Sequence, residues 1–143
     1  MENDTDLYQD IILDHWQNPR SGNLDIMPDA TITISNDSCG DSSSVGVSHN
    51  TNKITSVRAL TTGCTICMAS SSMMTEIMHD IPAAEAHIYV DALRDMVTSG
   101  TVPAALHHTD LAALRGVASY PNRVKCAMLP WLALESALKG IGE

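Results

Sequence analysis

The spacing of apolar residues changes twice along the chain. It is helical near the amino end, alternates in the middle, and is helical again in the second half. The first pattern predicts a helix over about 5–16, which Asn18-Pro19 ends. The alternating pattern predicts three short strands over 31–35, 43–48 and 54–60. Because the connections between them are short, we expect an antiparallel meander.

The second half of the chain predicts helices over about 65–79, 80–99, 110–118 and 121–139. Asp80 is expected to cap the second of these, with Pro82 near its first turn. Pro130 cannot donate a hydrogen bond inside the last helix, so we expect a kink or two helical pieces there. Strands followed by helices predict an α+β fold, with a three-stranded antiparallel sheet packed against several helices.

Length and charge predict the number of domains and exclude some kinds of partner. The 143 residues contain no internal repeat or linker and predict one domain over 1–143. A net charge of −9, with only eight Lys and Arg, argues against nucleic acid or an anionic membrane as partner. The acidic start resembles no secretion signal, and no apolar run is long enough to span a bilayer. We therefore expect a cytoplasmic protein whose thiols stay reduced.

Three of the four cysteines and one aspartate occupy positions suited to a shared site. Cys39 and Asp41 flank a glycine in the first predicted connection, where a tight turn could aim both side chains one way. Cys64 follows Gly63 where the third strand meets a helix. The free N–H groups at a helix start favour anions, so a thiol there is a good nucleophile and metal ligand.

The remaining cysteine of this set, Cys126, has basic neighbours. Lys125 precedes it and Arg123 lies three residues back, and nearby cations predict a lowered pKa for its thiol. Three thiolates with one carboxylate suit tetrahedral Zn²⁺, and thiolates also suit iron–sulfur clusters. The spacing matches no zinc-ribbon pattern, so the fold must bring the four residues together. Taken singly, each cysteine could also be a small buried apolar residue.

Two other features invite rival interpretations. Cys64 and Cys67 form a CxxC, which could be a redox dithiol, but no βαβ pattern surrounds it. We favour a buried core position for Cys67, and a disulfide with Cys64 in the absence of metal stays open. His15 is expected to fix the loop that follows the first helix rather than to bind metal.

Short motifs spread over nearly the whole length form a specific combination. They are Tyr8-x-x-Ile11, His15-x-x-Asn18-Pro-Arg20, Cys39-Gly-Asp41, Gly63-Cys64 and Pro121-x-Arg123-x-Lys125-Cys126-Ala127. With them the chain resembles the U-type iron–sulfur cluster assembly proteins, the NifU/IscU scaffold family, and most closely its SufU branch. Two features favour that branch: Lys125, where IscU-like proteins carry histidine, and the long stretch between Cys64 and Cys126.

The resemblance implies a SufE/NifU-like fold and a zinc site made by Cys39, Asp41, Cys64 and Cys126. It also implies that Cys39 accepts persulfide sulfur from a SufS-like, PLP-dependent cysteine desulfurase and passes it to downstream iron–sulfur assembly proteins. Arg123 and Lys125 would steady the site or orient the partner. The alternative is a scaffold that assembles a transient iron–sulfur cluster on the same cysteines. Whether the chain is a sulfurtransferase or only a persulfide carrier stays open.

Overall fold

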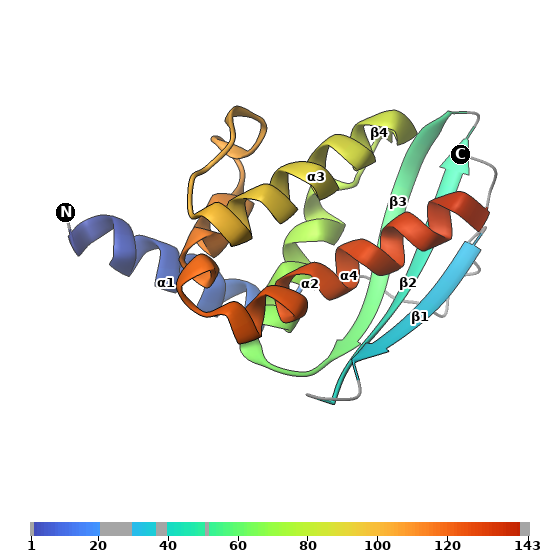
Figure 1. Cartoon of the computed structure of the whole chain (residues 1–143). Helices are drawn as coiled ribbons and strands as arrows, with labels where there is room; N and C mark the ends of the chain where they lie inside the picture. Colours follow the sequence, from blue (N-terminus) through green and yellow to red (C-terminus); the bar gives the residue numbers. More distant parts are fainter. Residues whose placement is uncertain (1, 21–29, 37–39, 51, 141–143) are drawn as a thin grey trace.

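A computed structural model describes residues 2–20, 30–36, 40–50 and 52–140 of the chain. The described elements follow in this order: α1 (Glu2–Gln17), β1 (Ala30–Asn36), β2 (Asp41–Asn50), β3 (Lys53–Thr62), α2 (Thr65–Ile77), β4 (Ile81–Pro82), α3 (Ala83–Ser99), the 3₁₀ helices η1 (Ala104–Leu106) and η2 (Asp110–Ser119), and α4 (Pro121–Gly140) (Figure 1). The predicted α+β class is confirmed. In the described part, no helix is both long and apolar enough to cross a membrane.

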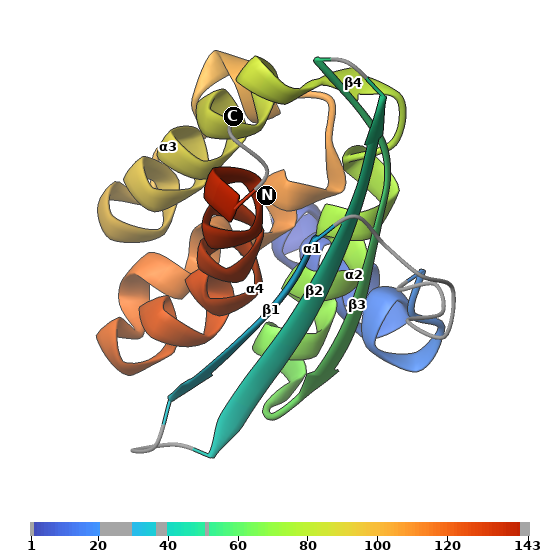
Figure 2. The same cartoon turned by 90° about the vertical axis from the view of Figure 1, so that its right-hand side faces the viewer.

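The strands form one antiparallel sheet in the order β1-β2-β3-β4. α4 runs along β1 and β2, and α2 lies beside β3 (Figure 2). Alternate residues of β2 are buried, including Ser43, Val45 and Val47. Successive side chains of a strand point to opposite faces, so Asp41 belongs to this same buried row. The strand thus carries a carboxylate into the protein at its first residue.

The sheet has four strands where the sequence predicted three. Ile81 and Pro82 pair with Ile54 and Lys53 instead of opening a helix, and α3 begins only at Ala83. The prediction that Asp80 caps this helix is wrong, because Asp80 has a positive φ of 59° and Pro82 is the capping residue. A residue before proline is biased toward extended backbone, which favours pairing of Ile81 with the sheet.

Two helices differ in form from the prediction. α4 is one helix from Pro121 to Gly140, so the expected division into two pieces at Pro130 is wrong. Proline removes a single backbone donor there, and the buried Ala127, Trp131 and Leu134 keep the helix packed around it. The segment predicted as helix over 110–118 is the 3₁₀ helix η2. Its buried leucines and valine, spaced by three residues, share one side in a three-residue repeat.

The core lies between the sheet and the helices and is rich in methionine. Met73, Met74 and Met78 of the α2 region are fully buried, as is Trp131 of α4. The Trp131 indole N–H donates to Ser70 Oγ at 3.1 Å, so its polar atom is satisfied. This contact joins the middle of α2 to the middle of α4, and the neighbouring Ser71 accepts a hydrogen bond from Thr61 near the end of β3.

Candidate metal centre

Three of the four predicted site residues meet although they lie on three different elements. Asp41 opens β2, Cys64 precedes α2, and Cys126 lies in the first half of α4. One carboxylate oxygen of Asp41 and the two Sγ atoms all lie within 4.8 Å of one another. Asp41 and Cys126 are buried, and Cys64 is partly exposed. Cys39, the fourth predicted residue, lies outside the described residues.

Gly63 makes room for the Asp41 carboxylate. Its φ is +152°, and a Cβ built on it would overlap Asp41 Oδ1. The next residue contributes a hydrogen bond, since the Cys64 backbone N–H donates to the same Oδ1 at 3.2 Å. Only glycine allows this approach. Sequence reasoning used Gly63 to mark the strand–helix junction but missed this steric role, because the carboxylate that it faces comes from a distant strand.

Cys64 is the N-cap of α2, at the strand–helix junction that the sequence predicted. Its backbone is extended, with φ −74° and ψ 167°, and its Sγ accepts a hydrogen bond from the Cys67 N–H at 3.5 Å. The side chain therefore occupies the position where serine or aspartate commonly caps a helix. The N-cap position thus places this sulfur beside the free N–H groups of the helix start.

The second carboxylate oxygen of Asp41 indicates that the site suits a cation. Oδ2 is buried and has no hydrogen-bond partner among the described residues. An unpaired buried carboxylate oxygen is costly, whereas a bound cation would satisfy it. Two thiols and a carboxylate form a donor set that zinc accepts, and Cys39 is two residues from Asp41 in the sequence. The described residues thus fit a metal ion held by thiolates and one carboxylate.

The protonation of Cys126 differs from the prediction. Burial raises the pKa of its thiol above the usual range, and the neighbouring Asp41 and Cys64 raise it further. The lowered pKa expected from Lys125 and Arg123 is therefore wrong, because burial outweighs the exposed cations. Arg123 does interact with the two thiols. The charge of Cys64, and then a hydrogen bond with Cys126, raise the pKa of the Arg123 guanidinium. Lys125 is exposed on α4.

A second group of potential ligands lies elsewhere, formed by His15, Glu76 and Asp110. The buried His15 shares hydrogen bonds with Ser72 Oγ through Nδ1 and with Asp110 Oδ2 through Nε2, both at 2.7 Å. The Arg20 backbone N–H donates to the same Ser72 hydroxyl at 2.8 Å. His15 thus ties α1 to α2 and η2, whereas the sequence predicted that it would fix the loop after the first helix.

Cys67 is fully buried, as predicted for a core cysteine. It belongs to a small apolar cluster with Cys126 and Leu129, against which Cys64 and Ile66 pack. Its place one helical turn after Cys64 puts it beside the proposed ligands, but it is not one of the three residues that converge.

The profile of the NifU-like N-terminal domain matches residues 7–139. The chain belongs to the NifU-like N-terminal domain family. The family predicted from the sequence motifs is therefore confirmed, and the match runs from within α1 to the last turn of α4.

Curated relatives of this NifU-like chain fall under two names. It is 36% identical over 134 residues to the iron–sulfur cluster assembly scaffold protein IscU of Streptococcus pyogenes serotype M1, covering 93% of this chain and 83% of that protein. It is 32% identical over 138 residues to the zinc-dependent sulfurtransferase SufU of Bacillus subtilis strain 168, covering 96% and 90%.

Solved structures confirm the NifU-like fold. A protein of Fervidobacterium islandicum AW-1, named FiSufU for the SUF iron–sulfur assembly system, superposes with a TM-score of 0.80. It is 27% identical, and the match covers 90% of this chain and 93% of that one. Another crystal structure, of a protein described only as hypothetical, has a TM-score of 0.85 and 35% identity over 94% and 98% of the two chains.

Proposed function

We propose that this chain is a zinc-dependent sulfur-transfer protein of iron–sulfur cluster biogenesis. In this proposal Cys39 accepts persulfide sulfur from a PLP-dependent cysteine desulfurase, and Cys39, Asp41, Cys64 and Cys126 hold the zinc ion. The observation that carries the proposal is the convergence of Asp41, Cys64 and Cys126, together with a buried oxygen of Asp41 that has no hydrogen-bond partner among the described residues. The Bacillus subtilis relative, named a zinc-dependent sulfurtransferase, supports the choice of activity.

The chemistry that zinc would supply when bound is to keep its thiol ligands deprotonated at neutral pH without redox activity of its own. This matters most for Cys126, whose thiol otherwise stays protonated because burial raises its pKa. Asp41 contributes a harder, weaker ligand, and the Cys64 N–H holds its other oxygen in place. Arg123, close to the two thiols, would offset part of the negative charge of the ligand set.

The transfer step balances without an added oxidant. The Cys39 thiolate attacks the outer sulfur of the partner's cysteine persulfide, and a new S–S bond forms on Cys39. The S–S bond of the partner breaks, and its cysteine leaves as a thiolate. One sulfane sulfur moves from chain to chain, and neither protein is oxidised overall. Downstream iron–sulfur assembly proteins would then receive the sulfur.

The second candidate is a scaffold that assembles a transient iron–sulfur cluster on the same cysteines. It is favoured by the Streptococcus pyogenes relative, which is named a cluster assembly scaffold and is 36% identical. Lys125, where IscU-like proteins carry histidine, favours transfer instead.

Metal analysis of the untagged chain, purified without chelators, separates the two candidates. Sulfur transfer predicts one tightly held zinc per chain and faster cysteine turnover when the chain is added to a cysteine desulfurase. Mass spectrometry should then find an extra 32 Da on Cys39, and Cys39→Ser should abolish it. A brown protein with iron and sulfide, able to hand its cluster to an apo-acceptor, would support the scaffold. Unchanged desulfurase turnover would remove the acceptor role.

A further inference from the structure

A groove of about 740 Å³ lies next to the metal centre, between α1, the end of α3, η2 and the start of α4. It adjoins the centre through two of its lining residues. Ile66 packs against the Cys67–Cys126 cluster, and Arg123 lies beside the Cys64 and Cys126 thiols. The volume is in the range of natural ligand sites. Of its lining residues, only Arg123 has a role in the transfer chemistry proposed above.

The charge of the groove is opposite to that of the whole chain. Seventeen acidic residues outnumber eight basic ones in the sequence, yet the described lining contains two arginines and no Asp or Glu. Arg20 and Arg94 form ion pairs with carboxylates elsewhere on the surface. Among the described residues, by contrast, no ion pair joins Arg115 or Arg123 to a carboxylate, and the polar partners of Arg123 are the Cys64 and Cys126 thiols. The groove therefore favours a negatively charged occupant.

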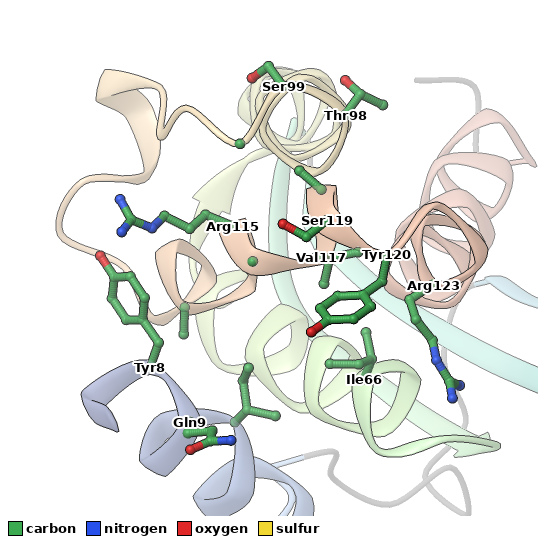
Figure 3. Close-up of a pocket in the computed structure, with 15 residues that line it drawn as sticks. Tyr8, Gln9, Ile66, Thr98, Ser99, Arg115, Val117, Ser119, Tyr120 and Arg123 are labelled. Carbon is green, nitrogen blue, oxygen red and sulfur yellow. The ribbon is translucent and has the colours of Figure 1, made fainter. Parts of the chain in front are cut away.

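Two tyrosines give this surface the side chains that are common at protein interfaces. Tyr120 is 66% exposed although it lies in the middle of the groove (Figure 3). The Arg115 guanidinium lies 5.3 Å from the centre of the Tyr8 ring, which holds the cation in place. Tyrosine and arginine are enriched among residues that contribute most to binding between proteins. The groove holds two of the three tyrosines in the chain.

The arrangement of the cations distinguishes an extended ligand from a compact one. Figure 3 shows Arg115 and Arg123 on opposite sides of Tyr120, with their guanidiniums directed apart. A single phosphate needs donors that converge on one point. Two separated guanidiniums with apolar and hydroxyl-bearing side chains between them suit a peptide that carries spaced carboxylates. Ile66 and Val117 supply the apolar part, and Ser119 a hydroxyl.

We propose that the groove binds an extended acidic segment of the cysteine desulfurase and thereby orients that partner at the metal centre. The choice of this partner rests on the function proposed above, whereas the acidic character of the segment rests on the groove. Carboxylates of the segment would pair with Arg115 and Arg123, and its chain would cross Tyr120 between them.

A desulfurase titration tests the proposal. Alanine release from cysteine is measured against increasing concentration of the zinc-loaded chain. Arg115→Glu should raise the half-saturating concentration about tenfold or more, since like charges repel across an interface. Zinc content should stay at one per chain. The matched control is Arg94→Glu, an exposed arginine of α3 outside the groove, which should leave the half-saturating concentration unchanged. Equal curves for wild type, Arg115→Glu and Tyr120→Ala would overturn the proposal.

A peptide experiment separates failure of the groove from failure of the proposed function. A fluorescent ten-residue Glu/Ala peptide should bind the full-length chain, and a Lys/Ala peptide of equal length should not. Tyr120→Ala, which alters only an exposed side chain, should weaken this binding. Displacement of the acidic peptide by equimolar inorganic phosphate would indicate a small-anion site and overturn the proposal. If the wild-type chain does not stimulate the desulfurase but binds the acidic peptide, the sulfur-transfer function fails, and the groove stands as a site for acidic peptides.

Discussion

Two clusters among the described residues each place three potential metal ligands within 4.8 Å of one another, and they differ in how many of their polar atoms have protein partners. In the cluster of His15, Glu76 and Asp110, both ring nitrogens of the histidine have protein partners at 2.7 Å. In the cluster of Asp41, Cys64 and Cys126, a buried carboxylate oxygen has none in the described part of the chain. The first cluster is complete as a hydrogen-bonded link between helices, and the second is not.

The difference shows that proximity alone does not define a metal site. Carboxylates and histidines often lie close together because they bond to one another, and such a group gains little from a cation. In the second cluster one buried carboxylate oxygen lacks a partner among the described residues, and burying such an oxygen without a cation costs free energy. The pKa of the Cys126 thiol in this cluster is raised, mainly by burial and then by the carboxyl of Asp41. The folded protein without metal therefore disfavours the thiolate form that a metal would bind. The predictions below test the contrast.

Loss of a thiol ligand should have the largest effect. If four ligands share the ~10–16 kcal/mol typical of structural zinc sites, Cys64→Ala or Cys126→Ala should weaken zinc binding about 100- to 1000-fold. Competition with a chromophoric chelator measures this affinity. Cys67→Ala is the matched control, because it removes a buried thiol from the same cluster without removing a proposed ligand. Similar losses in all three variants would contradict the ligand assignment.

His15→Ala should destabilise the fold but leave zinc binding intact. It removes the link between α1, α2 and η2 and exposes Ser72 to an empty space, which should cost about 2–4 kcal/mol of unfolding free energy. Urea unfolding at fixed zinc concentration measures the loss. A fall in zinc affinity comparable to that of Cys64→Ala would mean that the two clusters are not independent.

Gly63→Ala should have a smaller effect, because it alters the metal centre without removing a ligand. The added Cβ collides with Asp41 Oδ1, and alanine at a φ of +152° is strained. We expect a loss of about 1–3 kcal/mol in stability and weaker zinc binding. Gly116→Ala is the control, since a Cβ there meets nothing within 4 Å. Equal behaviour of the two variants in thermal unfolding and zinc titration would show that Asp41 needs no such space.

A pH titration of the metal-free chain should give the smallest effect. The folded state raises the pKa of Cys126 above its unfolded value near ~8.5, so it holds a proton that the unfolded chain releases. This contribution to stability is complete below ~8.5 and is lost as pH rises, by at most about 1.4 kcal/mol per pH unit. Urea unfolding in EDTA at pH 8 and pH 10 measures it. The change of unfolding free energy with pH should be smaller in Cys126→Ala and in the zinc-saturated chain.

Local patterns in the sequence predicted a large part of this structure. The alternation around Val45 and Val47 gave the strand and its buried face, and Gly63-Cys64 gave the start of a helix. The strand of Ile81 and Pro82 was missed, because proline was interpreted as a helix start and its pairing partners are distant in the sequence. The raised pKa of Cys126 was missed for a similar reason: the basic neighbours are visible in the sequence, but burial is a property of the assembled core.

The proposed metal ligands lie on elements that are distant in the sequence, so the lifetime of the protein would depend on the supply of metal. Asp41, Cys64 and Cys126 come from a strand, a helix start and a distant helix, so the site exists only after these elements have packed. A metal that binds only the packed chain stabilises it by mass action, roughly 1.4 kcal/mol for each tenfold excess over the dissociation constant. Cells short of zinc would then hold more of this chain in opened forms that proteases cut. Its abundance would follow zinc availability even with synthesis unchanged.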